Sequence, residues 1–109
     1  MAQDALDGRL LDALYEVIES RRDGDVETSR TAKLFAKGVP KIAQKVGEEA
    51  VEALIEAVAG NRKELAAESA DLLYHLLVMW AACGMKPEEV WAILDKRRGA
   101  AWVADEDDD

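Results

Sequence analysis

Residues 45–71, which read KVGEEAVEALIEAVAGNRKELAAESAD, decide the fold. At about 100° per residue, the rotation of an α-helix, the side chains of residues 41–57 separate onto two sides. This pattern predicts one amphipathic helix with an acidic stripe. The charged side carries Lys41, Lys45, Glu48, Glu49, Glu52 and Glu56, and the apolar side carries Ile42, Val46, Ala50, Ala53, Leu54 and Ala57.

Gly60 and Asn61 interrupt this helix. Glycine accepts the left-handed conformation that ends a helix, and asparagine suits the N-cap of the next one. A second helix is therefore expected after this turn, and it leads into an almost wholly apolar run over residues 72–83. Within an arc of about 60° on this helix lie Glu64, Glu68, Asp71 and His75.

The acidic residues are placed symmetrically about the turn. Glu52 lies eight residues before Gly60, and Glu68 lies eight residues after it. Glu49 lies eleven residues before the turn glycine, and Asp71 lies eleven residues after it. With a rise of about 1.5 Å per residue, an antiparallel hairpin brings the two members of each pair level. The sequence therefore predicts four carboxylates that face one another in two layers.

Such a cluster of carboxylates calls for a cation. Like charges between packed helices raise one another's pKa and destabilise the fold. Oxygen ligands without Cys or a second His favour a hard ion, Mg²⁺ first and Mn²⁺ second. The alternative is that the acids form two solvated faces in a chain that is 34% charged. The matched depth of the two pairs favours the metal site.

At these residues the chain resembles a known family. The spacing from Glu48-Glu49-x-x-Glu52 to Glu68-x-x-Asp71 is similar to the EExxE and ExxD signature of the MazG-like all-α nucleotide pyrophosphohydrolases. Within that superfamily, the chain resembles the phosphoribosyl-ATP pyrophosphohydrolase family of histidine biosynthesis over about residues 10–98. The segments that carry this likeness are SRTAKL at 29–34, KVGEEA at 45–50 and ESADLLYHLLV at 68–78.

The resemblance implies Mg²⁺-dependent hydrolysis of phosphoribosyl-ATP, between its α- and β-phosphates, to phosphoribosyl-AMP and pyrophosphate. Glu48 would be a further metal ligand or would orient water, and the general base is left open among the carboxylates. The implied metal ligands are Glu49, Glu52, Glu68 and Asp71, and the implied catalytic residues are Glu48, Glu49 and Glu52.

Two alternative functions remain open at this point. One is housecleaning hydrolysis of non-standard or deoxynucleoside triphosphates by the same metal site. The other is a non-enzymatic helical dimerisation module, in which the acidic residues are surface residues and the hairpin only packs.

A basic series precedes the acidic stripe in an otherwise acidic chain. Isolated lysines on helices are commonly solvated, and this interpretation stands beside a functional one. The position next to the carboxylates favours phosphate binding, because the phosphate oxygens that a metal leaves uncovered need other cations. The series is Arg30, Lys33, Lys37, Lys41 and Lys45, of which Arg30, Lys37, Lys41 and Lys45 are the predicted substrate-binding residues.

Length and composition indicate one domain, residues 1–104, followed by an acidic tail, residues 105–109, that is expected to be disordered. With a formal net charge of −9, the chain is not expected to bind nucleic acid. No apolar run is long enough for a membrane span, and no signal peptide is visible. The single cysteine, Cys83, is expected to be a core residue of a cytoplasmic protein.

The whole pattern predicts an all-α bundle of four to five helices around the central hairpin. A first helix is expected over residues 7–21, a short one over 30–36 and a last one from Pro87. Because a small chain with several broad apolar helix faces has few partners to cover them, a homodimer is expected to complete the core. The aromatic residues expected to serve in packing are Trp80, Trp91 and Trp102.

Overall fold

The structure, a computed structural model that describes residues 6–100 and 102, is all-α, as the sequence predicts. Five α-helices lie in this part of the chain, and a short 3₁₀ helix over Arg98–Ala100 follows the last of them. Within the described residues, no helix is both long enough and apolar enough to cross a membrane. The helices are α1 (Arg9–Ser20), α2 (Arg30–Lys37), α3 (Val39–Ala59), α4 (Arg62–Ala82) and α5 (Pro87–Arg97).

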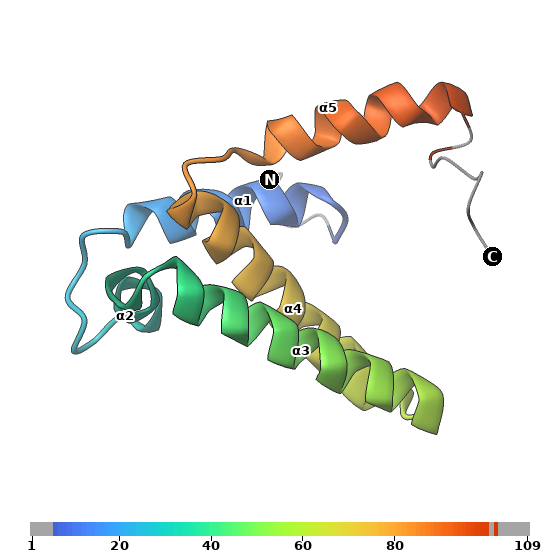
Figure 1. Ribbon diagram of the computed structural model, residues 1–109, viewed down its shortest axis with the longest axis horizontal. Coiled ribbons are helices and arrows are strands. Elements are labelled where there is room, and N and C mark those ends of the chain that lie inside the picture. The colour runs from blue at the N-terminus through green and yellow to red at the C-terminus, as the bar shows by residue number, and fades with distance from the viewer. Residues whose placement is uncertain (1–5, 101, 103–109) are drawn as a thin grey trace.

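The α3–α4 hairpin is the central element, and its two helices lie antiparallel and side by side (Figure 1). Gly60 ends α3 in the left-handed conformation, with a φ of 81°, and Asn61 precedes α4, as predicted. The Asn61 side chain does not cap α4 but donates to Glu56 Oε1 at 2.8 Å. The Asn61 backbone N–H also donates to the Glu56 carbonyl at 3.0 Å, which closes the end of α3.

The hydrophobic core lies at the end of the hairpin away from its turn, where α1 and α2 pack on it (Figure 1). Ile42 of α3 and Leu77 and Val78 of α4 are buried completely or almost so. Full burial of such a side chain stabilises a fold by about 1.5–3 kcal/mol, so this core fixes the base of the hairpin. The other core residues are Tyr15, Ile18, Leu34 and Ala81.

Nearer the turn, α3 carries an apolar stripe that the described residues leave uncovered. Val51, Leu54, Ile55 and Val58 recur at helical spacing, and each is more than half exposed. Of the predicted apolar side of α3, Ile42 and Ala53 are buried and Leu54 is exposed, whereas Val51, Ile55 and Val58 were not part of that prediction. No helix of the described residues covers this stripe.

Helix ends follow local signals in the sequence. Ser29 caps α2, because its hydroxyl accepts a backbone N–H of the first turn at 3.1 Å. Gly38, with a φ of 92°, separates α2 from α3, and Pro40 lies in the first turn of α3. Helix α1 starts two residues later than predicted, because Asp7 stays outside it and accepts the Arg9 backbone N–H at 2.9 Å.

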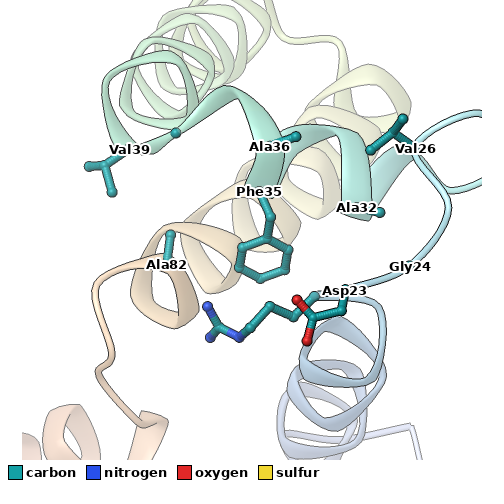
Figure 2. Close-up of a pocket in the computed structure, with 10 residues that line it drawn as sticks. Asp23, Gly24, Val26, Ala32, Phe35, Ala36, Val39 and Ala82 are labelled. Atoms are coloured by element: carbon teal, nitrogen blue, oxygen red, sulfur yellow. The ribbon is translucent and has the colours of Figure 1, made fainter.

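A hollow of about 330 Å³ lies where the α1–α2 loop, α2 and the end of α4 meet (Figure 2). The Arg22 guanidinium lies over the Phe35 ring, 4.7 Å from its centroid. Arg22 also donates to the Ala81 carbonyl at 2.7 Å, so it ties the end of α1 to α4. No acidic residue of the hairpin lines this hollow, which is separate from the carboxylate cluster.

The prediction that Cys83 is a core residue is wrong. Cys83 is exposed and directly follows the last residue of α4. The apolar run in the sequence continues past the end of the helix, so composition alone does not mark this position. Trp80 and Trp91 pack edge to face with centroids 6.0 Å apart, as expected, whereas Trp102 is about half exposed. The predicted acidic tail, residues 105–109, lies outside the described residues.

Candidate active site

Three carboxylates from the two hairpin helices meet at one place. Glu49 comes from α3, and Glu68 and Asp71 come from α4, one turn apart. One oxygen of each lies within 4.8 Å of the others. The antiparallel pairing of α3 and α4 about Gly60 brings these positions together, as the spacing in the sequence leads one to expect.

Two oxygens of this cluster are buried without a partner. Glu49 is only 8% exposed, and its Oε1 accepts no hydrogen bond from the described residues. The same holds for Oε1 of Glu68. A buried carboxylate oxygen without a partner is costly, and a cation at this point would remove that cost. The all-oxygen donor set fits Mg²⁺ or Mn²⁺.

Repulsion within the cluster changes the acidity of Glu68. The nearby Glu49 carboxylate, burial, and the nearby Glu52 carboxylate raise the pKa of Glu68 from 4.5 to about 7. In the metal-free protein, Glu68 therefore keeps its proton to a higher pH than a free carboxyl group does.

Glu52, the fourth predicted ligand, lies at the edge of the cluster. It is exposed and close enough to Glu68 to raise the pKa of that residue, but it is not one of the three that meet within 4.8 Å. The predicted two layers are therefore uneven. Glu68 is grouped with Glu49 and Asp71, and not only with Glu52, its predicted level partner.

Glu48 is not one of the three carboxylates that meet, and its recognised partners are Gln44 and Lys45. It accepts a hydrogen bond from the Gln44 amide at 2.8 Å, and its carboxylate lies 3.7 Å from the Lys45 ammonium. The Gln44 hydrogen bond and the nearby lysines hold the pKa of Glu48 below its usual value. Adjacent side chains on a helix differ by about 100° in direction, so the Glu48 and Glu49 side chains lie in different environments.

The predicted basic series forms one pocket of about 440 Å³ beside Glu48. The α2 and α3 helices each supply one side of it, and all four predicted substrate-binding residues line it. Gln44 is the lining residue that sequence reasoning missed, because an uncharged side chain gave no signal within a basic run. The pocket is lined by Arg30, Lys33, Leu34, Lys37, Lys41, Gln44, Lys45 and Glu48.

His75 is buried deep in α4. It is fully buried, and its Nδ1 lies 2.9 Å from the Asp71 carbonyl oxygen. Because a carbonyl only accepts, Nδ1 carries the proton and Nε2 is left as an acceptor without a partner among the described residues. The sequence places His75 on the same helix face as Asp71 and favours a hydrogen-bonded core histidine over a ligand, and its burial and hydrogen bond confirm this interpretation.

The fold and site define an all-α protein with a carboxylate cluster in a helix hairpin and a basic pocket beside it, an arrangement suited to a phosphate-bearing ligand. Residues 11–98 match the family model of phosphoribosyl-ATP pyrophosphohydrolase. The chain therefore belongs to the phosphoribosyl-ATP pyrophosphohydrolase family. This membership confirms the family predicted from the sequence and the prediction that the chain is an enzyme.

Several curated relatives are more than half identical to this chain over the aligned residues. A phosphoribosyl-ATP pyrophosphatase of Azospirillum brasilense is 53% identical over 105 residues, which cover 96% of this chain and 95% of the relative. One of Gluconobacter oxydans is 56% identical and covers 88% of this chain and 72% of the relative. One of Paramagnetospirillum magneticum is 53% identical, and the alignment covers 94% of this chain and 92% of the relative.

Proposed function

We propose that this chain hydrolyses phosphoribosyl-ATP between the α- and β-phosphates, releasing phosphoribosyl-AMP and pyrophosphate, as a step of histidine biosynthesis. The observation that carries the proposal is the pair of buried, unpartnered oxygens of Glu49 and Glu68. Glu49 is adjacent in sequence to Glu48, which lines the basic pocket. The names of the curated relatives supply the substrate.

Glu49, Glu68 and Asp71 would hold a Mg²⁺ ion, with Glu52 at the edge as a fourth ligand and Mn²⁺ as a possible substitute. An ion held there neutralises phosphate charge and lowers the pKa of water, the two contributions that phosphoanhydride hydrolysis needs. These ligands come from two helices fixed by the same core, so the cluster is held in position before the substrate arrives.

The cations near the cluster bind and orient the phosphate chain. Lys45 lies about one turn before Glu49 on α3, and its ammonium is already held beside Glu48 at 3.7 Å. Glu48 therefore positions Lys45, and both Glu48 and Gln44 lie where a phosphate chain would pass. The carboxylates of the site, Glu48, Glu49 and Glu52 among them, are the candidates for accepting the proton of the attacking water.

A product assay tests this function. The purified chain is offered phosphoribosyl-ATP, ATP and deoxynucleoside triphosphates in separate reactions with Mg²⁺, and pyrophosphate and orthophosphate are measured. The proposal requires pyrophosphate from phosphoribosyl-ATP with the highest kcat/KM. A higher kcat/KM for deoxynucleoside triphosphates would favour the housecleaning function in its place.

Thermal melting tests the metal without any substrate. An ion that binds the folded state raises stability by about 2.7 kcal/mol when its concentration is a hundred times Kd. After chelation, millimolar Mg²⁺ should therefore raise the Tm of the wild type and not that of Glu68→Gln. An equal effect on both proteins would contradict the ligand assignment.

We also propose that the active form is a homodimer in the cytoplasm. The α3 apolar stripe, Val51, Leu54, Ile55 and Val58, is the surface that a second copy would bury. A single free cysteine, Cys83, fits a reducing compartment. We expect the phosphate-bearing substrate, and neither nucleic acid nor a membrane surface, to be the ligand of the basic pocket.

A further inference from the structure

The basic pocket contains more positive charge than a triphosphate held at the carboxylates requires. Five cationic side chains line it against the single carboxylate of Glu48. Along α3, Lys45 lies about 6 Å before Glu49 and Lys41 about 12 Å before it, at the rise of an α-helix. The cations contributed by α2 line the side of the pocket that faces α3.

The pocket thus has a near part and a far part. The near part is Lys45 with Gln44 and Glu48, which are joined by an ion pair and a hydrogen bond. Within residues 6–100, the far cations make no ion pair as short as 4.0 Å with a carboxylate. The far part is Arg30, Lys33, Lys37 and Lys41.

One far cation is held in place by an aromatic ring. The Arg30 guanidinium lies 5.8 Å from the centroid of the Tyr74 ring, and the Tyr74 hydroxyl is hydrogen bonded to that of Thr31. A guanidinium supported in this way presents a planar set of donors that matches two oxygens of one phosphate group. The far part therefore contains one cation that lies over an aromatic ring, beside three lysines.

We propose that the far part of the basic pocket binds the phosphate of the phosphoribosyl group and so selects phosphoribosyl-ATP over ATP. This inference rests on the proposed function for the identity of the substrate. Such a substrate carries phosphate at two separate ends, its triphosphate and its phosphoribosyl group. With the triphosphate at the carboxylates and Lys45, the second phosphate is the anionic group left for Arg30 and Lys41.

The competing interpretation is that one triphosphate chain runs through the whole pocket. With the bond between the α- and β-phosphates at the carboxylates, only the pyrophosphate unit would extend along the pocket. This unit is shorter than the two helical turns that separate Glu49 from Lys41, which disfavours this arrangement. The two interpretations differ in one measurable respect. If the far part binds a second phosphate, removal of a far cation weakens the binding of phosphoribosyl-ATP much more than that of ATP. If it binds the triphosphate, removal of the cation weakens the binding of both nucleotides alike.

The test compares Lys41→Gln and Lys37→Gln with the wild type, using kcat/KM for phosphoribosyl-ATP and the inhibition constant of ATP. Loss of one charge-assisted hydrogen bond should lower kcat/KM for phosphoribosyl-ATP by about ten-fold or more. The inhibition constant of ATP should rise by a clearly smaller factor. Lys63→Gln, at the exposed start of α4, is the matched control and should leave both values unchanged.

Equal factors for the two nucleotides, or no change in either, would overturn the proposal. A second measurement is independent of catalysis. Ribose 5-phosphate alone is titrated into the protein, and calorimetry gives its affinity. Wild type should bind it at millimolar concentration, and Lys41→Gln should bind it about ten-fold more weakly.

The two failures can be told apart. Absence of turnover of phosphoribosyl-ATP by the wild type would refute the proposed function. Absence of ribose 5-phosphate binding, or equal binding by wild type and Lys41→Gln, would refute the selection of the second phosphate even if turnover is normal.

Discussion

Oε1 of Glu49 and Oε1 of Glu68, on neighbouring antiparallel helices, are both buried, and neither accepts a hydrogen bond from the described residues. Oxygens of these two residues and of Asp71 lie within 4.8 Å of one another. A fold retains such a pair only when something else stabilises it, because buried negative charge without a partner is strongly unfavourable. A proton or a cation has to stand between them.

The first prediction concerns the ligand role of Glu68. Glu68→Gln keeps the shape of the side chain but removes a negative oxygen from the cluster, so turnover at saturating Mg²⁺ should fall by about a hundred-fold or more. Steady-state pyrophosphate release measures this. Glu64→Gln, one turn earlier on α4 and exposed, is the matched control and should retain near-normal activity. Near-normal turnover by Glu68→Gln would show that the ligand assignment is wrong.

The second prediction concerns the pH dependence of the metal-free protein. The pKa of Glu68 is about 7 in the folded chain against 4.5 for a free carboxyl, so the folded state binds this proton more tightly than the unfolded state. Stability from this group is therefore complete below pH 4.5 and is lost as pH rises toward 7. Thermal melting in a chelator should show the Tm of wild type falling relative to Glu68→Gln over this range.

Saturating Mg²⁺ should abolish that difference in slope for the wild type, because the ion replaces the proton between the carboxylates. Parallel curves for wild type and Glu68→Gln in the chelator would mean that Glu68 does not hold the proton.

The third prediction separates substrate binding from metal binding. Among the described residues, the Lys45 ammonium lies beside Glu48 and forms no ion pair with Glu49, Glu68 or Asp71. Lys45→Ala should therefore lower kcat/KM for a triphosphate substrate by about ten-fold, through KM or kcat, while Mg²⁺ affinity without substrate changes much less. Calorimetry with Mg²⁺ alone gives the second value. An unchanged kcat/KM would mean that the substrate lies on the other side of the carboxylates.

The fourth prediction concerns the α3 apolar stripe. Leu54 lies in the middle of this stripe and is 55% exposed. Leu54→Glu therefore puts a charge where a second copy would pack, and it leaves the core of one chain intact. Sedimentation at micromolar concentration should show a dimer for wild type and a monomer for the variant. Val26→Glu makes the same change at an exposed apolar residue of the α1–α2 loop and should remain dimeric. A wild-type monomer would refute the dimer directly.

The hairpin and most of the carboxylate cluster were predictable from the sequence because their signals are local and periodic. Gly60 marks the turn, and equal spacing on either side of it sets which residues lie level. The sequence pattern places Glu48 and Glu49 together on the charged side of α3, and it did not predict that only Glu49 joins the three-carboxylate cluster. The basic series likewise predicted residues that the structure gathers in one pocket.

Features that depend on packing escaped the sequence. The run over residues 72–83 is almost wholly apolar, so no periodicity indicated that Cys83 lies beyond the helix and is exposed. The unequal layers of carboxylates depend on the conformation of Glu68, which spacing along two helices does not determine. Such details require the actual distance between α3 and α4.

The position of the core at one end of the hairpin determines which part of the hairpin unfolds locally first. Core side chains such as Ile42 and Leu77 secure the base, whereas the turn at Gly60 lies at the opposite end, beyond Glu49 and Asp71. A divalent ion bound by these carboxylates would link α3 to α4 at a second place, beyond the hydrophobic core. In a metal-free single chain, amide hydrogens near the turn should exchange with solvent long before those at the base, and ion binding should delay their exchange.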